Sequence, residues 1–226
     1  MEAPLYIELQ KNGINNTMNL LDFWNTYWKE TEKERDEYDL STSSAWRMAA
    51  ARTKNPEDGD WWFTNGYKFF ENWVTWRMEN PQYEIATLQD GSPAIELEMA
   101  LDINGVTIKM ALDRVFLDKN TDEYILVDIK TGKYTPDSAL QLGFYAYGLR
   151  KMHGINVTRG YYWMARRKDL SPSLNLAAFS DSKIETLVDM FDKARKSGIF
   201  LPNFDHCGMC GLTVHCDWYQ RKESNE

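Results

Sequence analysis

Cysteine and histidine are scarce in this sequence of 226 residues, which has three of each. The three cysteines lie close together near the C-terminus and cannot form a closed set of disulfides, so a reducing, cytoplasmic setting is expected. No stretch approaches the roughly 18 consecutive apolar residues that a membrane-spanning helix needs. The N-terminal segment Met1–Pro4 also lacks the basic start and apolar core of a secretory signal. These absences predict a soluble protein with no membrane partner.

Positive charge is also in deficit, because 26 basic residues face 34 acidic ones and leave a net charge of −8. This balance argues against a general basic coat for nucleic-acid binding. It is compatible with a local basic strip beside an acidic metal site, which is the combination that metal-dependent nucleases need. The nine tryptophans and twelve tyrosines have two interpretations. They fill a bulky core, or some of them stack on nucleobases.

The spacing of apolar residues predicts a mixed α/β fold. Period-two alternation indicates strands, and apolar residues three and four apart indicate helices. Helices are expected at 17–38, 41–52, 62–78, 137–152 and 181–196, and strands at 95–103, 106–113, 124–130 and 157–165. This order of helices, strand meander, helix, strand and helix predicts a central mixed β-sheet flanked by helices rather than a strict βαβ repeat.

Asn104-Gly105 joins the first two predicted strands and is a strong signal for a two-residue hairpin turn. Such a turn pairs Ile103 with Val106, and Glu96 then lies opposite Asp113 on the polar face of the hairpin. In the following strand, Asp128 and Lys130 alternate with apolar residues. If that strand presents them on the same side, the four polar residues converge on one patch of the sheet.

The predicted patch has the chemistry of a metal site. Solvated residues on an open sheet face are the simpler interpretation of each residue alone. As a set, however, clustered carboxylates repel one another unless a cation lies between them. Carboxylate oxygens suit Mg²⁺, which usually keeps several waters and meets substrate phosphate. The ammonium of Lys130 can then orient an attacking water or stabilise developing negative charge.

The next predicted helix places Gln141 and Tyr145 one turn apart on a single face. These two side chains can hydrogen-bond a backbone phosphate or support Lys130. The alternative is an ordinary amphipathic helix with a polar flank.

Together, three motifs resemble the RecB-type branch of the PD-(D/E)XK nuclease superfamily. The motifs are Ala111-Leu112-Asp113-Arg114-Val115, Ile125-Leu126-Val127-Asp128-Ile129-Lys130-Thr131-Gly132 and Gln141-Leu142-Gly143-Phe144-Tyr145-Ala146. The resemblance covers residues 95–152 closely. It implies a restriction-endonuclease-like core and Mg²⁺- or Mn²⁺-dependent hydrolysis of a DNA phosphodiester.

Residue by residue, the resemblance implies metal binding by Asp113 and Asp128 and catalysis by Lys130. It places the trailing motif of the family on Gln141 and Tyr145, and Glu96 joins the site through its register with Asp113. In size the chain resembles the compact exonucleases of CRISPR adaptation and phage recombination. That likeness implies DNA ends or single strands as substrate and a recombination or adaptation protein as partner.

Many relatives carry a histidine on a helix upstream of the hairpin, after a glycine. The corresponding stretch Asn65–Glu71 has no histidine, and Glu71 is a candidate substitute. This departure supports an alternative in which the chain is a non-catalytic DNA-binding or assembly protein on the same fold. A structure-specific or sequence-specific endonuclease is a further alternative.

The C-terminal tail carries Cys207, Cys210 and Cys216, flanked by His206 and His215. Three soft ligands in a glycine-rich loop predict a structural metal site, and three reduced, unligated cysteines are the alternative. In iron–sulfur relatives, three such cysteines join a distant fourth, which this chain lacks. Either histidine completes a Cys₃His zinc site, which we favour, or an iron–sulfur cluster forms with a non-cysteine fourth ligand.

These patterns divide the chain into three regions. They are an N-terminal helical region at 1–82, the nuclease core at 83–200 and the cysteine-rich tail at 201–226. Arg166, Arg167 and Lys168 follow the last predicted strand and are candidate phosphate contacts, as are Arg47, Arg52 and Lys54 near the second helix. Scattered surface charge is the alternative for each of them.

Overall fold

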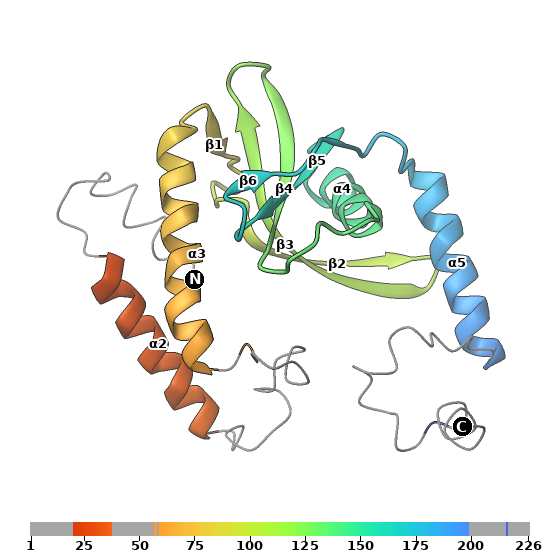
Figure 1. Ribbon diagram of the computed structural model, residues 1–226. Coiled ribbons are helices and arrows are strands. Elements are labelled where there is room, and N and C mark those ends of the chain that lie inside the picture. The colour runs from red at the N-terminus through yellow and green to blue at the C-terminus, as the bar shows by residue number, and fades with distance from the viewer. Residues whose placement is uncertain (1–19, 38–56, 58, 199–215, 217–226) are drawn as a thin grey trace.

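The computed structural model describes residues 20–37, 57, 59–198 and 216, and these form a mixed sheet flanked by helices (Figure 1). The helices are α2 (Leu20–Glu37), α3 (Gly59–Glu79), α4 (Leu140–His153) and α5 (Asp181–Ser197). The strands are β1 (Tyr83–Ile85), β2 (Ile95–Ile103), β3 (Val106–Asp118), β4 (Glu123–Lys130), β5 (Arg159–Met164), β6 (Asp169–Leu170) and β7 (Leu174–Asn175). None of these helices combines the length and apolarity that a membrane span requires.

The strands form one sheet in the order β1-β3-β4-β5-β6, with β2 beside β3 and β7 beside β5. β4 and β5 run parallel, and the other paired strands run antiparallel. Because β4 and β5 are parallel, the chain must cross over between them, and α4 forms this crossover. The C-terminal ends of β4 and β5 therefore lie together at one edge of the sheet.

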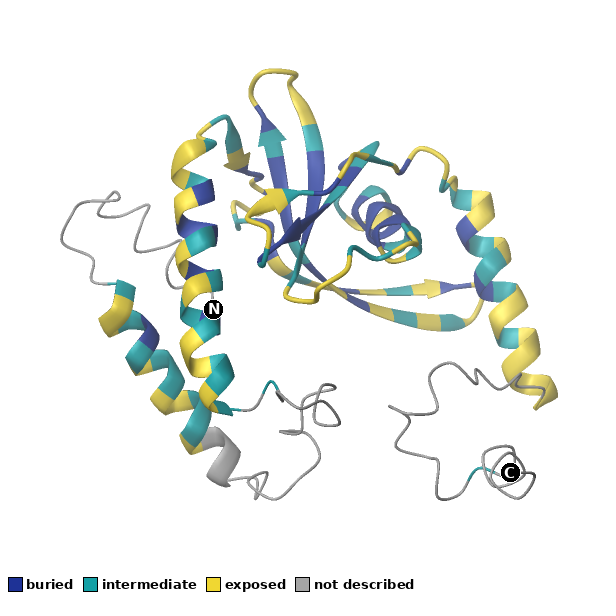
Figure 2. Ribbon diagram, in the orientation of Figure 1, coloured by how far each residue is buried: buried dark blue, intermediate teal, exposed yellow. Residues whose placement is uncertain are grey.

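Helices α4 and α3 cover opposite faces of the sheet (Figure 2). The α4 face is mainly aliphatic, and its core includes Leu112, Val115, Leu126, Leu142 and Leu149. The α3 face is aromatic, and its core contains Trp73, Trp76, Phe116 and Trp163. The rings of Trp73 and Trp163 form a T-shaped pair with 4.9 Å between centroids, which is a favoured aromatic geometry. Much of the tryptophan content therefore fills this core.

Helices α2 and α5 pack at the periphery of this core of one sheet between two helices. Trp24 of α2 lies against Gly66 of α3, where an added Cβ would come within 2.7 Å of the indole ring. Only a glycine therefore lets α2 and α3 approach this closely. At the other end, Ile184 and Val188 of α5 pack against Ile103 at the tip of the β2–β3 hairpin.

The hairpin has the register that Asn104-Gly105 predicts, with Ile103 opposite Val106 and Leu97 opposite Leu112. Nevertheless, the regular pairing is interrupted between Glu96 and Asp113. Leu97 packs on the α4 side, whereas its neighbour two residues away, Ile95, lies in the α3 core. Glu96 has a left-handed backbone with φ of 47°. At this point the side chains of both strands change faces. The apolar residues that alternation would place on one face of the hairpin are therefore divided between the α4 side and the α3 side of the sheet.

Most elements predicted from the sequence are present, with shifted ends. The second hairpin strand continues to Asp118 instead of 113 because its extra residues pair with β1, which the sequence did not reveal. The helix expected from 137 begins at Leu140, whose backbone N–H donates to Ser138 Oγ at 3.1 Å. The predicted helix at 41–52 and the cysteine-rich tail, except for Cys216, lie outside the described residues.

The turnover at Glu96 predicts an unusual response to glycine. A side chain in the left-handed region costs about 1–2 kcal/mol. Glu96→Gly should therefore be more stable than Glu96→Ala by about 1 kcal/mol. At Glu98, which lies in regular strand, Gly should be less stable than Ala by about 0.5–1 kcal/mol. Urea unfolding of the four variants measures both differences, and the same sign at both positions would contradict the left-handed geometry.

Candidate active site

The polar residues at the end of β4 lie on the α4 side of the sheet. Leu126 belongs to the α4 core while Val127 belongs to the α3 core, so strand alternation directs Asp128 and Lys130 toward α4. Asp128 is only 2% exposed. The ammonium of Lys130 lies 2.6 Å from Asp128 Oδ2 and forms an ion pair with this buried carboxylate.

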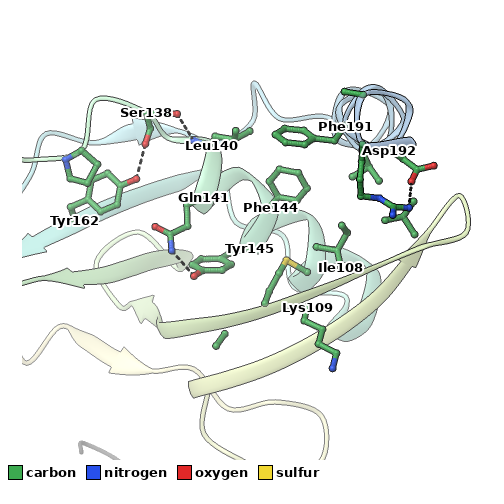
Figure 3. Close-up of a pocket in the computed structure, with 17 residues that line it drawn as sticks. Ile108, Lys109, Ser138, Leu140, Gln141, Phe144, Tyr145, Tyr162, Phe191 and Asp192 are labelled. Carbon is green, nitrogen blue, oxygen red and sulfur yellow. Dashed lines mark hydrogen bonds and ion pairs between the residues drawn. The ribbon is translucent and has the colours of Figure 1, made fainter. Parts of the chain in front are cut away.

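Helix α4 extends this ion pair into a hydrogen-bonded chain. Lys130 Nζ donates to Gln141 Oε1 at 3.1 Å, and Gln141 Nε2 donates to Tyr145 Oη at 2.8 Å. The second of these bonds is drawn in Figure 3. The structure thus brings Asp128, Lys130, Gln141 and Tyr145 together at the crossover from β4 to α4.

Asp113 reaches the same strand from β3, at the point where the hairpin turns over. Its Oδ2 accepts a hydrogen bond of 2.6 Å from the backbone N–H of Ile129, the residue between Asp128 and Lys130. Its charge is close enough to Asp128 to raise the pKa of that carboxyl. The two carboxylates that the sequence singled out are therefore neighbours.

Glu96 is placed differently. Its side chain is 52% exposed and lies 3.7 Å from Arg114 Nη1. Arg114 itself is 3% exposed, and its guanidinium lies 5.0 Å from the centre of the Trp73 ring on the α3 side. Glu96 thus pairs with a buried arginine instead of joining the chain that contains Lys130.

Burial determines the electrostatics of the centre. It is the main cause that raises the pKa of Asp128, the charge of Asp113 adds to the effect, and the hydrogen bond from Lys130 opposes it. Tyr162 lies beside Asp128 in the parallel pairing of β4 with β5. Burial and the Asp128 charge raise the pKa of Tyr162 to about 12. The centre thus carries negative charge in a poorly solvated place, which a bound cation would relieve.

Tyr162 is a neighbour of the centre that the sequence analysis did not identify. The ammonium of Lys130 lies 5.6 Å from the centre of its ring, and its hydroxyl donates to the backbone oxygen of Ser138 at 2.7 Å. The available signal was its position in a strand parallel to β4, but the register of a parallel pair is not visible in the sequence.

The donor set fits a hard divalent cation. Mg²⁺ is commonly held by one or two carboxylates together with water and substrate phosphate. Asp113 and Asp128 can supply those carboxylates. Within the described part of the chain, no group of three or more His, Cys, Asp or Glu side chains is arranged to hold an ion. A metal at this centre would therefore depend on the aspartate pair, water and substrate.

The helix upstream of the hairpin presents no histidine to the centre. On the α3 side of Asp113 lies a cavity of about 330 Å³, with Trp62, Gly66 and Phe69 of α3 among its lining residues. Glu71, the candidate substitute, is exposed and does not line this cavity. Aromatic side chains and a glycine thus occupy the helix face next to Asp113.

A larger cavity of about 920 Å³ opens on the α4 side, between the hairpin, α4 and α5 (Figure 3). Gln141, Tyr145 and Tyr162 form the part of its wall nearest to Lys130. The rest is largely apolar and includes Phe144 of α4 and Phe191 of α5, whose rings face each other across the cavity.

The three basic residues after β5 have different surroundings. Arg166 pairs with Glu57 at 2.8 Å, and its guanidinium lies 4.9 Å from the centre of the Trp61 ring. Arg167 and Lys168, in contrast, are exposed. The geometry assigns Arg166 to holding the fold together and leaves its two neighbours open to solvent.

Of the three cysteines in the tail, one belongs to the described residues. Cys216 is described and is partly buried. Cys207, Cys210, His206 and His215 lie outside the described residues, so the predicted metal site of the tail remains a prediction.

The chain belongs to the PD-(D/E)XK nuclease superfamily, because the model of that family matches residues 16–217. Membership predicts nuclease activity, and the mixed sheet flanked by helices agrees with the fold expected of the family. The chain is also 27% identical over 161 residues to the Gene 69 protein of Mycobacterium phage D29. That alignment covers 68% of this chain and 58% of the relative, so the chain spans less than two thirds of the length of the phage protein. Among solved structures, one named "Crystal structure of SSO0001" aligns with 14% identity over 96% of each chain, with a TM-score of 0.41.

The buried charge of Asp128 predicts a measurable effect of pH on stability. The folded state raises the pKa of Asp128 above the 3.8 of an ordinary aspartate and so binds the proton more tightly than the unfolded chain does. The contribution of Asp128 to folding stability is therefore complete at a pH below its pKa in the unfolded chain. It is lost as the pH rises through its pKa in the folded protein. Asp128→Asn, which resembles the protonated form, should therefore be more thermostable than wild type at pH 7. This difference should shrink as the pH falls toward 4.

Calorimetry of both proteins across this pH range measures the effect. A difference in Tm that grows as the pH falls would show that burial does not dominate at Asp128.

Proposed function

We propose that this chain is a metal-dependent deoxyribonuclease of the RecB-type branch that acts as an exonuclease. The observation that supports this most directly is the convergence of Asp113, Asp128, Lys130, Gln141 and Tyr145 on one crossover of the sheet. An isolated amphipathic helix or solvated sheet face would not require a buried carboxylate with a raised pKa. Perturbed carboxylates beside a cavity are typical of catalytic sites.

In this proposal Asp113 and Asp128 hold Mg²⁺ or Mn²⁺. A divalent cation at such a site supplies Lewis-acid stabilisation of phosphate charge and lowers the pKa of bound water. Asp113 is positioned by the backbone of Ile129, and Asp128 is oriented by Lys130.

Lys130 is the residue that would act on the reacting atoms. Its ammonium has three hydrogens; it donates one hydrogen bond to Gln141 and forms an ion pair with Asp128. In this proposal a further hydrogen of the ammonium is donated to an attacking water or to a phosphoryl oxygen. Gln141 and Tyr145 then act as positioning residues, because the hydroxyl of Tyr145 orients the amide that accepts from Lys130.

The biological role follows by extension. The similarity to a mycobacteriophage protein and the compact size support a role in phage or prokaryotic recombination, repair or CRISPR-type DNA processing. DNA ends or single strands are the proposed substrate, and a recombination or adaptation protein is the proposed partner. The division into residues 1–82, 83–200 and 201–226 is part of the same proposal.

One observation favours a second function. On the α3 side of Asp113, helix α3 supplies aromatic side chains instead of a ligand, and Glu96, which lines the same cavity, pairs with Arg114, so weak metal binding is expected in this alternative. The chain would then be a DNA-binding or assembly protein with a degraded centre. Activity in Mn²⁺, which binds protein ligands more tightly than Mg²⁺ in many sites, separates the two functions.

Asp128→Ala should reduce cleavage at least about 100-fold, because it removes charge stabilisation that acts in the transition state. Glu98→Ala is the matched control, since it removes one exposed carboxylate from the sheet. Purified proteins are incubated with end-labelled single- and double-stranded DNA in Mg²⁺ or Mn²⁺. A closed circular substrate is included, and an exonuclease should leave it intact.

Wild-type activity in Asp128→Ala would contradict the assignment of the centre. Cleavage of the circle by wild type would identify an endonuclease instead. No cleavage of any substrate in either metal would favour the non-catalytic function.

For the tail we propose a structural metal bound by Cys207, Cys210 and Cys216, with His206 or His215 as fourth ligand for zinc. Metal-binding free energy at such a site contributes to folding. Cys207→Ser should therefore lower Tm, while the rate per folded molecule changes little. Elemental analysis of protein purified without oxygen distinguishes zinc from an iron–sulfur cluster, and absence of both metals would contradict the proposed site.

A further inference from the structure

The loop that joins β4 to α4 begins directly after Lys130 and carries Tyr134. Tyr134 is 86% exposed, more than any other large apolar or aromatic residue in the described part of the chain. Residues 131–134 are all exposed, and Figure 2 shows this loop in yellow between the end of β4 and the start of α4. An aromatic ring in this position fills no core.

Three hydrogen bonds fix the loop on the body of the protein. Arg166 Nε donates to the backbone oxygen of Thr131 at 2.7 Å, and Arg167 Nη1 donates to Thr135 Oγ1 at 3.1 Å. Tyr162 Oη donates to the backbone oxygen of Ser138 at 2.7 Å. The residues before and after Tyr134 are thus held in place. A ring presented on an anchored loop loses little conformational entropy when it binds a partner.

Cationic residues lie on the same loop as this ring and on the neighbouring turn, although the whole chain carries a net charge of −8. Lys133 precedes it; its side chain is 62% exposed, and its ammonium lies 3.6 Å from Glu57 Oε1. Because β4 and β5 end at the same edge of the sheet, the turn after β5 lies beside the loop, as the bond from Arg167 to Thr135 shows. This turn contributes Arg167 and Lys168, both exposed, and the guanidinium of Arg167 also pairs with Asp169 at 3.1 Å. Lys168 is held with φ of 63° in the left-handed region, which directs the chain sharply at this point.

An exposed aromatic ring flanked by cations is the combination that binds single-stranded nucleic acid, since the ring stacks on a base and the cations neutralise phosphates. We propose that Tyr134 stacks on an unpaired base of the DNA substrate, and that Lys133, Arg167 and Lys168 contact its backbone. This proposal rests on the proposed nuclease function and adds to it a specific determinant of substrate position.

Chain length limits where the stacked base can lie. Tyr134 is the fourth residue after Lys130, so their Cα atoms are at most about 14 Å apart. A single strand with stacked bases rises about 3.4 Å per nucleotide. With the reach of both side chains added, the base on Tyr134 therefore lies within several nucleotides of the phosphate that Lys130 would contact. Stacking is tolerant of sequence, because every base has a π-face.

The test measures DNA binding without divalent metal, so that it does not depend on cleavage. A fluorescein-labelled single-stranded oligonucleotide is titrated with protein in EDTA, and anisotropy gives Kd. Tyr134→Ala should weaken binding about 10-fold, whereas Tyr134→Phe, which keeps the ring, should stay within about 2-fold of wild type. Tyr134 is exposed, so both variants should keep the wild-type Tm.

Salt dependence separates stacking from charge. Lys168→Ala should reduce the slope of log K against log salt by about 0.7, the value for one phosphate contact on a single strand. Lys193→Ala removes an exposed lysine from α5 and is the matched control, with no change in slope expected. Tyr134→Ala should weaken binding without changing the slope.

A third comparison identifies the stacked base. An oligonucleotide with abasic sites near its end should bind wild type and Tyr134→Ala with similar affinity, because the stacking partner is missing. Equal Kd values of Tyr134→Ala and wild type for the intact strand would overturn the role of Tyr134 and leave the nuclease proposal standing. A wild-type protein that bound no DNA in this assay and cleaved none in Mn²⁺ would overturn both proposals.

Discussion

The ion pair between Asp128 and Lys130 at the end of β4 is the interaction on which the rest of the site depends. A carboxylate that is 2% exposed can stay charged only with a close cation and hydrogen bonds. Lys130 supplies one such partner, and it is held in turn by Gln141 at the start of α4. The position of α4 after the crossover therefore determines where the ammonium of Lys130 lies relative to the carboxylate of Asp128. Without α4 seated on the aliphatic face of the sheet, neither Lys130 nor Asp128 would have a defined position.

The turnover of the hairpin serves the same centre. At Glu96 and Asp113 the strands exchange their faces, which lets Asp113 reach the backbone of Ile129 on the neighbouring strand. A regular strand would direct consecutive side chains strictly to alternate faces. The left-handed backbone at Glu96 is thus local strain located at a functional site, where such strain is commonly found. Its cost is offset by the packing of Ile95 in the aromatic core on the α3 side.

Sequence patterns predicted the elements that depend on local chemistry. Asn104-Gly105 specified the hairpin register, and the i, i+4 spacing of Gln141 and Tyr145 placed both on one helix face. The patterns failed where distant segments decide the outcome. The three residues of β1 are too few to show a period, yet they extend β3 to Asp118. Arg166 pairs with Glu57, which lies far away in the chain. The basic residues 166–168 therefore do not form one uniform strip, because the first is held in an ion pair and the other two are exposed. Apolar and polar residues also alternate without a break through Glu96 in the sequence. The sequence therefore gives no sign that the strands change faces at this residue.

The central claim is that Asp113 and Asp128 form the metal-binding part of a nuclease centre. The most direct test is a crystal structure of the protein soaked in Mn²⁺, with the metal located by its anomalous scattering. The account predicts a peak within about 2.0–2.6 Å of oxygens from both aspartates, which disappears in Asp128→Asn. A Mn²⁺ ion bound instead at Glu96, or the absence of any peak between the two aspartates at saturating metal, would contradict it.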